Sequence, residues 1–328
     1  MQSKPNGIWT NLHAQLHRTL KERQLLERGQ RVLVAVSGGQ DSLCLVKLLL
    51  DLQSKWGWDL AIAHCNHRWR TDSDANADYV HQLAQTWQLP DYQQNAEDVC
   101  TSEAEARSWR YQVLTAIAQQ HGYSCIVTGH TASDRAETLL YNLMRGSGAD
   151  GLQALVWKRS LTPDIQLVRP LLGTTRVQTG QFCQSAPLQI WDDTTNHDLT
   201  YARNRIRQEL LPYLQTHFNP QAEYALSQTA ELLQAEVEYL ETQAAALLQQ
   251  AQHPDRPGLN RSLLQKTPLA LQRRAVRQFL QQTLPYAPNF EHIEKLVALM
   301  TAPNRSQTDP FPGGAIAQVE GTWIWLKL

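Results

Sequence analysis

The chain has 328 residues, of which 42% are hydrophobic and 19% charged, a composition that indicates a globular protein rather than a disordered one. Its 30 basic and 31 acidic residues give a formal net charge of −1, which excludes an overall basic field that would attract nucleic acid or membranes. No apolar run approaches the roughly 18 residues of a membrane span. The five scattered cysteines argue against a zinc ribbon or a disulfide framework and favour a reducing, cytoplasmic location.

Short apolar runs alternate with helical patterns in the first part of the chain, up to about residue 200. An N-terminal helix is predicted at about 9–26, and further helices at about 42–55, 74–88, 102–121 and 134–145. Strands are predicted at Val32–Val36, Leu60–His64, Cys125–Gly129 and Ile165–Val168. Strands that alternate with helices predict an α/β fold with a doubly wound parallel sheet. Ligands of such sheets bind outside the carboxyl ends of the strands.

After Pro212 the pattern becomes mainly helical. One helix is predicted over residues 222–250, a second segment ends near Thr283 after the linker at 251–258, and a short helix covers Glu291–Met300. The pair Glu320-Gly321 is expected to turn a terminal hairpin. We therefore expect a catalytic domain at residues 1–214 and a smaller, mainly helical domain at 215–328.

The stretch RVLVAVSGGQDSLCLVKLLL, residues 31–50, places a polar turn between a buried strand and a helix. Gly38 and Gly39 permit positive φ and close backbone approach, so that N–H groups can converge on an anion at the helix start. Ser37 and Ser42 add hydroxyl donors. Asp41 beside a phosphate site makes sense mainly if Mg²⁺ lies between them; the plainer alternative is an acid that favours the helix dipole. The turn matches neither a Walker A loop nor a dinucleotide turn.

The next strand leads into AHCNHRWR, which contains His64, Asn66, His67 and Arg70. Two histidines three residues apart are a weak metal signal, and a core histidine followed by a surface histidine is an equally good interpretation. Because this stretch follows a strand's carboxyl end, we expect it to lie near a bound nucleotide.

The stretch GHTASDRAETLLYNLMRGSGADGL, residues 129–152, contains the next candidates. Asp134 and Glu137 are three residues apart, which places two carboxylates on one face at the start of a helix. Such carboxylates can hold Mg²⁺, bind an ammonium group or accept a proton from an attacking amine, or they can simply complement the helix dipole. The loop that begins with Arg145 is cationic and rich in glycine, which suits an RNA backbone.

Two groups of arginines are candidates for RNA contact. Arg107 and Arg110 share a helix face with Tyr111, although Arg107 and Glu103 can also form an ordinary i, i+4 pair. Further along, three arginines fall within five residues, Arg203, Arg205 and Arg207. They can grip RNA phosphates or neutralise Asp192, Asp193 and Asp198, and the sequence leaves both interpretations open.

SGGQDS resembles the pyrophosphate-binding loop of the N-type ATP pyrophosphatases, the PP-loop superfamily. SGGQDS, AHCNHRWR, EAEARSWRY, GHTASDRAET with LMRGSGADGL, RPLL and the block at 192–207 occur in the order of the tRNA(Ile)-lysidine synthetase family, and the resemblance is dense over about residues 28–215. The chain looks like the shorter form of that family. It departs from the family's G-H-x-x-D-D-Q-x-E-T pattern because Ser133 precedes Asp134 and Arg135 follows it, which questions any role that needs two adjacent acids.

The resemblance implies an ATP-dependent ligation of L-lysine to C2 of the wobble cytidine of the CAU-anticodon tRNA(Ile), through an adenylated cytidine, with AMP and diphosphate as products. It implies ATP-binding roles for Ser37, Gly38, Gly39, Gln40, Asp41, Ser42, His64 and Asn66. Catalytic roles are expected for Asp41, His130, Asp134 and Glu137, Mg²⁺ ligation for Asp41 and Asp134, and tRNA contacts for Arg107, Arg110, Arg145, Arg203, Arg205 and Arg207. A homodimer would suit a short tRNA-binding enzyme.

Two other functions compete with this interpretation. Another PP-loop enzyme, such as a tRNA thiolase, commonly needs clustered cysteines, and no pair of cysteines in this chain has that spacing. The second alternative is an ATP-binding RNA chaperone without covalent chemistry, which would release no AMP.

Overall fold

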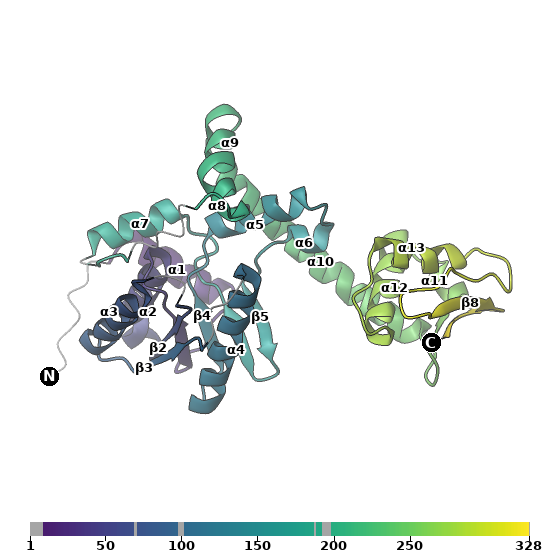
Figure 1. Ribbon diagram of the computed structural model, residues 1–328, viewed down its shortest axis with the longest axis horizontal. Coiled ribbons are helices and arrows are strands. Elements are labelled where there is room, and N and C mark those ends of the chain that lie inside the picture. Colours follow the sequence, from purple (N-terminus) through teal and green to yellow (C-terminus); the bar gives the residue numbers. More distant parts are fainter. Residues whose placement is uncertain (1–8, 69–70, 98–101, 187, 192–197, 328) are drawn as a thin grey trace. The chain divides into compact units, whose positions relative to one another are not determined.

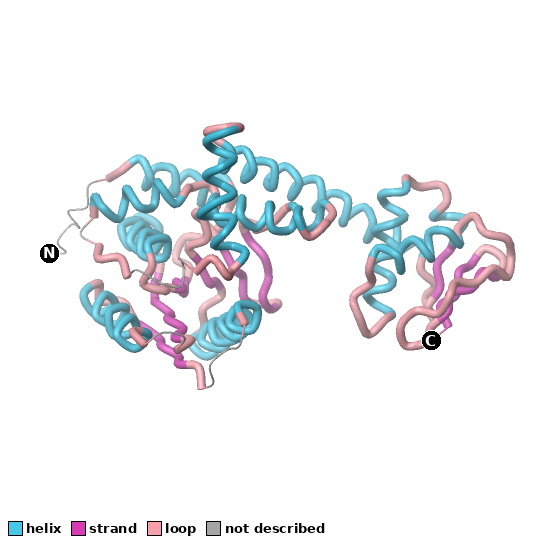
Figure 2. Tube along the Cα trace, turned by 45° about the horizontal axis from the view of Figure 1, so that its top comes forward, coloured by secondary structure: helices cyan, strands magenta, loops and turns pink. Residues whose placement is uncertain are grey.

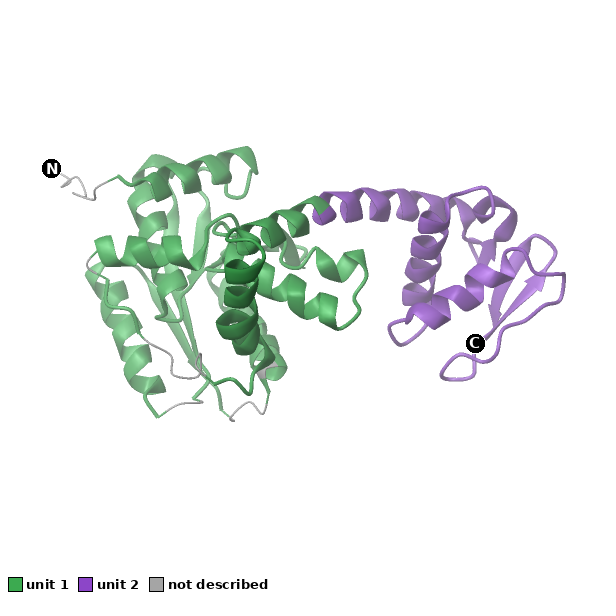
Figure 3. Ribbon diagram, turned by 90° about the horizontal axis from the view of Figure 1, so that it is seen from above, with its two compact units in different colours: residues 1–232 green, residues 233–328 purple. Residues whose placement is uncertain are grey.

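The computed structural model describes residues 9–68, 71–97, 102–186, 188–191 and 198–327, with the exception of the Glu103 side chain. The chain forms two compact units, residues 1–232 and 233–328, and the division falls within the long helix α10 (Ala222–Ala251) (Figure 3). Each unit has its own hydrophobic core.

The described part of the first unit contains a sheet of six strands in the order β3-β2-β1-β4-β6-β5 (magenta in Figure 2). The strands are β1 (Arg31–Ala35), β2 (Asp59–Asn66), β3 (Asp91–Asn95), β4 (Cys125–Thr128), β5 (Lys158–Thr162) and β6 (Ile165–Val168). All neighbours pair in parallel except β5 and β6, which are antiparallel. The predicted α/β fold is therefore confirmed, with an added antiparallel edge.

Alternate residues of the central strands point into two different cores. Val32 and Val34 of β1 pack in the cluster that includes α1 (Asn11–Glu22), α2 (Gln40–Trp56), α3 (Ser73–Thr86) and α7 (Arg176–Ser185). Leu33 of the same strand packs in the cluster that includes α4 (Glu103–His121). Helices therefore cover both faces of the sheet, as Figure 1 shows, and the polar ends of the strands are left for a site.

The carboxyl edge of the sheet is completed by α5 (Ala132–Met144), which confirms the helix predicted at about 134–145. The other elements at this edge are α6 (Ala149–Leu152), α8 (Ala202–Arg205), the π-helical turn η2 (Ile206–Leu210) and α9 (Leu211–His217). Ala136 and Leu140 of α5 pack with Ile206 of η2 and Leu211 of α9. This small apolar cluster brings the arginines of residues 203–207 next to the acids of α5.

The second unit is mainly helical, as predicted, and it also contains a small sheet. Its helices α11 (Arg261–Leu264), α12 (Leu269–Thr283) and α13 (Phe290–Leu299) accompany an antiparallel sheet in the order β7-β9-β8, formed by β7 (Gly258–Asn260), β8 (Ile316–Glu320) and β9 (Trp323–Lys327). The hairpin predicted at Glu320-Gly321 is present. No helix among the described residues is long and apolar enough to cross a membrane.

Candidate active site

The glycine turn joins β1 to α2 and has the geometry of an anion site. Gly38 adopts a φ of +84°, a region that favours glycine, and Gly39 is the residue that precedes the first turn of α2. The Ser42 hydroxyl accepts a hydrogen bond from the Ser37 amide at 3.1 Å and donates to the Gly39 carbonyl at 2.9 Å. The loop is thus held open with its amides and hydroxyls at a helix N-terminus, where an anion is stabilised.

Asp41 is a carboxylate held close to a second strand end. A Cβ atom on Gly129, the residue after β4, would lie 2.9 Å from both the carbonyl carbon and oxygen of Asp41, so glycine allows this approach. The Asp41 side chain accepts a 2.5 Å hydrogen bond from the Thr179 hydroxyl and lies 3.5 Å from a guanidinium nitrogen of Arg176. Burial raises the pKa of Asp41, and Arg176 offsets this effect only in part.

Asp134 serves as part of the cap of α5. Its Oδ2 accepts hydrogen bonds of 2.7 Å from both the Thr131 amide and the Thr131 hydroxyl, while its Oδ1 lies 3.5 Å from Arg207. Burial alone would raise the pKa of Asp134, but its interaction with His130, the Thr131 hydrogen bonds and the Arg207 charge bring it below its ordinary value. Asp134 is therefore a stable carboxylate.

His130 lies between the end of β4 and α5, and its Nδ1 is 2.8 Å from the Thr128 hydroxyl. Burial lowers the pKa of His130, the nearby Asp134 carboxylate offsets this effect only in part, and the positive charges of Arg169 and Arg107 lower the pKa further. The imidazole is therefore neutral at neutral pH, in a form that can donate or accept one hydrogen bond through each nitrogen.

Glu137 lies one turn beyond Asp134 and forms a two-point pair with Arg207. Arg207 donates from Nε and Nη2 to the two Glu137 oxygens at 2.6 and 2.8 Å. The Glu137 side chain is 2% exposed and that of Arg207 is 23% exposed. Burial raises the pKa of Glu137, whereas the Arg207 pair lowers it. Glu137 thus holds the Arg207 guanidinium in a position where its charge faces Asp134.

The end of β2 supplies a second wall of the site. The Nδ1–H of buried His64 donates to the Val36 carbonyl at 2.8 Å, which leaves Nε2 as an acceptor. Burial lowers the pKa of His64, so the ring is neutral. Asn66 donates to Asp74 at 2.9 Å and accepts from the Arg68 amide at 3.0 Å. Both side chains are thus fixed in place by their own neighbours.

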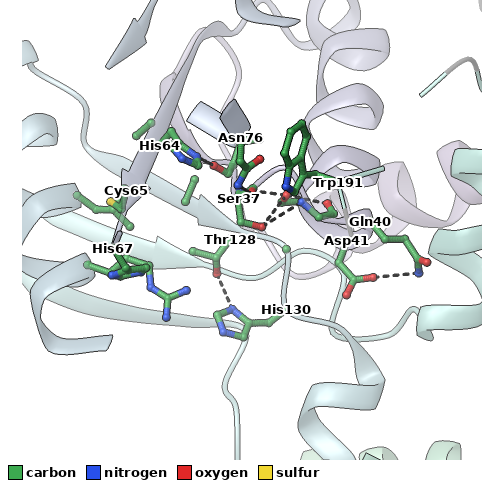
Figure 4. A pocket seen from close by; sticks show the side chains of 18 of the residues that line it. Ser37, Gln40, Asp41, His64, Cys65, His67, Asn76, Thr128, His130 and Trp191 are labelled. Atoms are coloured by element: carbon green, nitrogen blue, oxygen red, sulfur yellow. Dashed lines mark hydrogen bonds between the residues drawn. The ribbon is translucent and has the colours of Figure 1, made fainter. Parts of the chain in front are cut away.

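A cavity of about 410 Å³ joins these walls. Figure 4 shows Asp41, His64 and His130 around the same pocket. The predicted residues that line it are Ser37, Gly39, Gln40, Asp41, Ser42, His64, Asn66, Arg110, His130, Asp134 and Arg207. The sequence blocks, far apart along the chain, therefore converge on one space at the carboxyl ends of the strands.

The other predicted residues lie outside that lining. Gly38 shapes the loop, and Glu137 acts on Arg207. Arg203 donates to the Thr138 hydroxyl at 3.2 Å, and Arg205 donates to the carbonyls of Leu199 and Thr200. Arg107 and Arg145 lie over the rings of Tyr111 and Tyr141. Arg145 and Arg205 are exposed.

Several functional candidates in the structure were not singled out from the sequence. Arg176 and Trp191 line the cavity, and Thr179 bonds Asp41. Gln40 donates from Nε2 to the Arg176 carbonyl at 2.6 Å and to the Thr179 hydroxyl at 2.8 Å, so it ties α2 to α7. The RPLL block just before α7 was the one available signal, since it placed this part of the chain in the family pattern.

Ser133 and Arg135, the two departures from the family pattern, face α10 within the first unit. The Ser133 hydroxyl donates to Glu223 and accepts from the Arg176 amide at 3.0 Å. Arg135 is fully buried and donates to Glu231 at 2.9 Å. These side chains hold α5 in place rather than line the cavity. Arg70, Asp192 and Asp193 lie outside the described residues, as does the Glu103 side chain proposed to pair with Arg107.

Two family models match the chain. A PP-loop domain matches residues 9–214, and a TilS substrate binding domain matches residues 259–321. The first match contains the cavity and every candidate residue described above. The second lies in the smaller unit.

Curated relatives match nearly the whole chain. A tRNA(Ile)-lysidine synthase from Nostoc sp. (strain PCC 7120 / SAG 25.82 / UTEX 2576) is 66% identical over 98% of both chains. A tRNA(Ile)-lysidine synthase from Synechocystis sp. (strain ATCC 27184 / PCC 6803 / Kazusa) is 54% identical over 96% of this chain and 97% of its own. Among solved structures, the U34-tRNA thiolase NcsA from Methanococcus maripaludis superposes with a TM-score of 0.57 at 15% identity, covering 68% of this chain and 78% of its own. That likeness concerns the fold alone.

Proposed function

The chain belongs to the tRNA(Ile)-lysidine synthase family, and on that premise we propose that it joins L-lysine to C2 of the wobble cytidine in the CAU-anticodon tRNA(Ile). The observation that supports this proposal is the single cavity lined by the PP-loop, His130, Asp134 and Arg110. An ATP phosphate site and a polar site for a base and an amine thus share one space, as a two-step ligation requires.

In the first step the cytidine O2 attacks the α-phosphorus of ATP. The bond from that phosphorus to the bridging oxygen breaks, and diphosphate leaves. The amides of Gly38 and Gly39 and the hydroxyls of Ser37 and Ser42 would hold the β- and γ-phosphates. His64 and Asn66 would lie beside the nucleotide, and Gln40 would keep the loop in position through its bonds to α7. Positioning and preorganised charge are the main contributions that such a site makes to phosphate chemistry.

The donors present fit a magnesium ion. Mg²⁺ is usually bound by one or two carboxylates together with substrate phosphates. Asp41 and Asp134 line the same cavity and their charges act on each other, while the described residues contain no cluster of three or more side chains that could hold a metal without substrate. We assign the ion to Asp41, with Asp134 as its second ligand. Bound there, Mg²⁺ would neutralise charge on the phosphates.

In the second step the lysine ε-amine attacks C2. The C2–O2 bond breaks and AMP leaves with the former O2. The lysine nitrogen loses a proton as the new C–N bond forms. Asp134 is the carboxylate at the cavity that can bind the ammonium or accept that proton. Glu137 positions Arg207, whose charge faces Asp134. Neutral His130 and Arg110 would position the cytosine and its neighbouring phosphate.

The tRNA contacts extend beyond the cavity. We propose that Arg107, Arg145, Arg203 and Arg205, together with Arg207 at the cavity, meet the RNA backbone, and that the smaller domain (residues 215–328) contacts the same tRNA. A homodimer and a cytoplasmic location complete the proposal; the cysteines that the structure describes are free, which suits a reducing compartment.

A thiolase is less well supported than a lysidine synthase. The four described cysteines, Cys44, Cys65, Cys125 and Cys183, form no metal-binding cluster within the described residues. Thiolase chemistry would therefore have to obtain its sulfur without the cysteine cluster that such enzymes commonly use.

Release of AMP distinguishes an enzyme from an RNA-binding chaperone. With α-labelled ATP, Mg²⁺, lysine and a CAU-anticodon tRNA(Ile) transcript, the wild-type protein should form AMP only when the transcript is present. Asp41→Ala should reduce that rate by at least about 10²-fold while the protein stays folded. Equal AMP formation by this variant would contradict the role assigned to Asp41, and none by wild type would favour a binding module.

A further inference from the structure

Four arginines gather around one tyrosine beside the cavity. Tyr111 and Arg110 of α4 both line it. The guanidinium carbon of Arg107 lies 5.6 Å from the centroid of the Tyr111 ring, and that of Arg159 lies 5.1 Å from it. Arg169, which follows β6, is near enough to act on the same phenol: burial would raise the pKa of Tyr111, but Arg169, Arg107 and Arg110 lower it. We call Arg107, Arg110, Arg159 and Arg169 the Tyr111 arginine cluster.

Among the side chains that the structure describes, the cluster carries positive charge without carboxylate partners. Elsewhere in the first unit, Arg207 pairs with Glu137 and Arg135 pairs with Glu231. Within the described residues, no acid forms an ion pair with any of the four cluster arginines. Their mutual repulsion is visible in Arg107, whose pKa is lowered by burial and by the charges of Arg203, Arg110 and Arg159. The repulsion between like charges held together in this way is reduced when an anion binds.

Arg169 gives the cluster a rigid base. It is 2% exposed and donates from Nη1 to the Val156 carbonyl at 2.8 Å. Its Nε has no hydrogen-bond partner in the described part of the chain. A buried guanidinium without a counter-ion is costly unless negative charge lies nearby, and a bound anion would supply that charge.

The positions of the arginines identify the kind of anion. Arg110 borders the cavity, whereas Arg159 lies exposed on the edge strand β5, so the cluster runs from the cavity to the surface. We have assigned the ATP phosphates to the glycine loop, and free lysine has a single carboxylate. A nucleic acid presents phosphates in a row and is bound by arginines spaced along its backbone.

We propose that Arg107, Arg110 and Arg159, held around Tyr111 by buried Arg169, form the binding site for the phosphates that flank the target cytidine; this inference rests on the proposed function. Arg159 extends the set of RNA contacts expected from the sequence, and buried Arg169 supports that site. Arg159 reaches the site only because β5 runs antiparallel along the edge of the sheet and lies beside α4.

Arg159→Ala tests the proposal, with Arg31→Ala as a matched control. Arg31 also lies over a tyrosine, at 4.5 Å from the Tyr123 centroid, and is exposed. However, it is at the start of the central strand β1, at the amino ends of the parallel strands and away from the cavity, and it is paired with Asp59. Both variants remove one exposed charge from the full chain, and circular dichroism and urea unfolding verify that both fold.

The measurement is the Kd for the CAU-anticodon transcript over a range of salt concentrations. Arg159→Ala should weaken binding by about 10-fold at low salt and reduce the slope of log K against log salt by roughly 0.7–0.9 for each lost phosphate contact. Arg159→Lys should keep most of the slope because the charge remains. Arg31→Ala should match wild type. An unchanged Kd and slope for Arg159→Ala, or equal losses in the control, would overturn the proposal.

Two further readouts separate this inference from its alternatives. A raised KM for lysine in Arg159→Ala, with unchanged tRNA Kd, would assign the cluster to the lysine carboxylate and reject the phosphate site. Loss of tRNA affinity in Arg159→Ala together with no lysidine from the wild type would support the phosphate site and reject the proposed function.

Discussion

Asp41 keeps a charge at a position where burial opposes it. Thr179 and Arg176 stabilise the carboxylate, yet its pKa remains above the ordinary value because of burial. The free protein therefore carries a destabilised acid that a bound cation would relieve. Destabilising groups of this kind are common at functional positions, because the rest of the fold is stable enough to hold them in place.

Replacement of Asp41 by Asn should stabilise the protein while it impairs the reaction. An acid whose pKa is higher in the folded state than in the unfolded state lowers the stability at pH values above its folded pKa, where it is ionised in both states. This loss of stability disappears as the pH falls below the pKa of the unfolded state. Asp41→Asn should thus increase the free energy of unfolding by ~0.5–2 kcal/mol at neutral pH, without Mg²⁺. The gain should shrink in acid. Urea unfolding at several pH values tests this, and a gain that grows as the pH falls would contradict it.

A second prediction concerns the ion pair between Arg207 and Glu137. Arg207→Met would leave a buried carboxylate without its cation, which should reduce the free energy of unfolding by ~3–5 kcal/mol. In Arg207→Met/Glu137→Leu the buried Glu137 carboxylate is removed together with its cation, so much of this loss should be recovered, although Asp134 still loses the nearby charge of Arg207. Both variants should form little lysidine if Arg207 serves the site. Equal unfolding midpoints for the single and double variants would show that the pair is not energetically coupled.

At the scale of elements, the strand–turn–helix formed by β1, the glycine loop and α2 assigns different tasks to its two glycines. A Cβ on Gly38 would meet the Asn76 Oδ1 at 2.3 Å, and its φ of +84° is unfavourable for other residues. Gly39 has an ordinary φ of −78°, and its added Cβ would meet only the Ser37 hydroxyl, at 3.5 Å. One glycine is needed for folding, and the other leaves space for a ligand.

Gly38→Ala and Gly39→Ala should therefore fail in different assays. Gly38→Ala should lower the free energy of unfolding by ~1–2 kcal/mol or more because of the positive φ. Gly39→Ala should unfold within about 0.5 kcal/mol of wild type but show a raised KM for ATP, since the methyl group would crowd the phosphates. Urea unfolding and AMP kinetics on both variants provide the comparison. An unchanged KM for ATP in Gly39→Ala would exclude close phosphate approach at this glycine.

The elements also show what the sequence could and could not predict. Buried strands such as β1 and β4 are continuous apolar runs, so their positions were evident. The edge strand β3 reads DYQQN and is largely exposed, and its polar composition gave no strand signal. The three arginines of residues 203–207 were found by their spacing, but only the packing of η2 against α5 shows that Arg207 meets Glu137. Arg159 was missed because its strand, β5, was missed.

At the scale of the whole molecule, the two units contain matches to two different family models. The PP-loop domain match contains the cavity, and the TilS substrate binding domain match lies in the smaller unit. The net charge of −1 provides no general attraction for RNA, so the proposed tRNA binding relies on local groups such as the Tyr111 arginine cluster. Discrimination between transcripts that share an anticodon would have to depend on nucleotides outside the anticodon.

The most direct measurement is nucleoside mass analysis of a tRNA(Ile) transcript with a CAU anticodon after incubation with the purified protein, ATP, Mg²⁺ and lysine. The elongator tRNA(Met) transcript, which has the same anticodon, is the control. We predict a cytidine whose mass has increased by one lysine less one water in the first transcript and unmodified cytidine in the second. AMP release without any lysine adduct on the tRNA(Ile) transcript would contradict lysidine synthesis and redirect the search to another nucleophile.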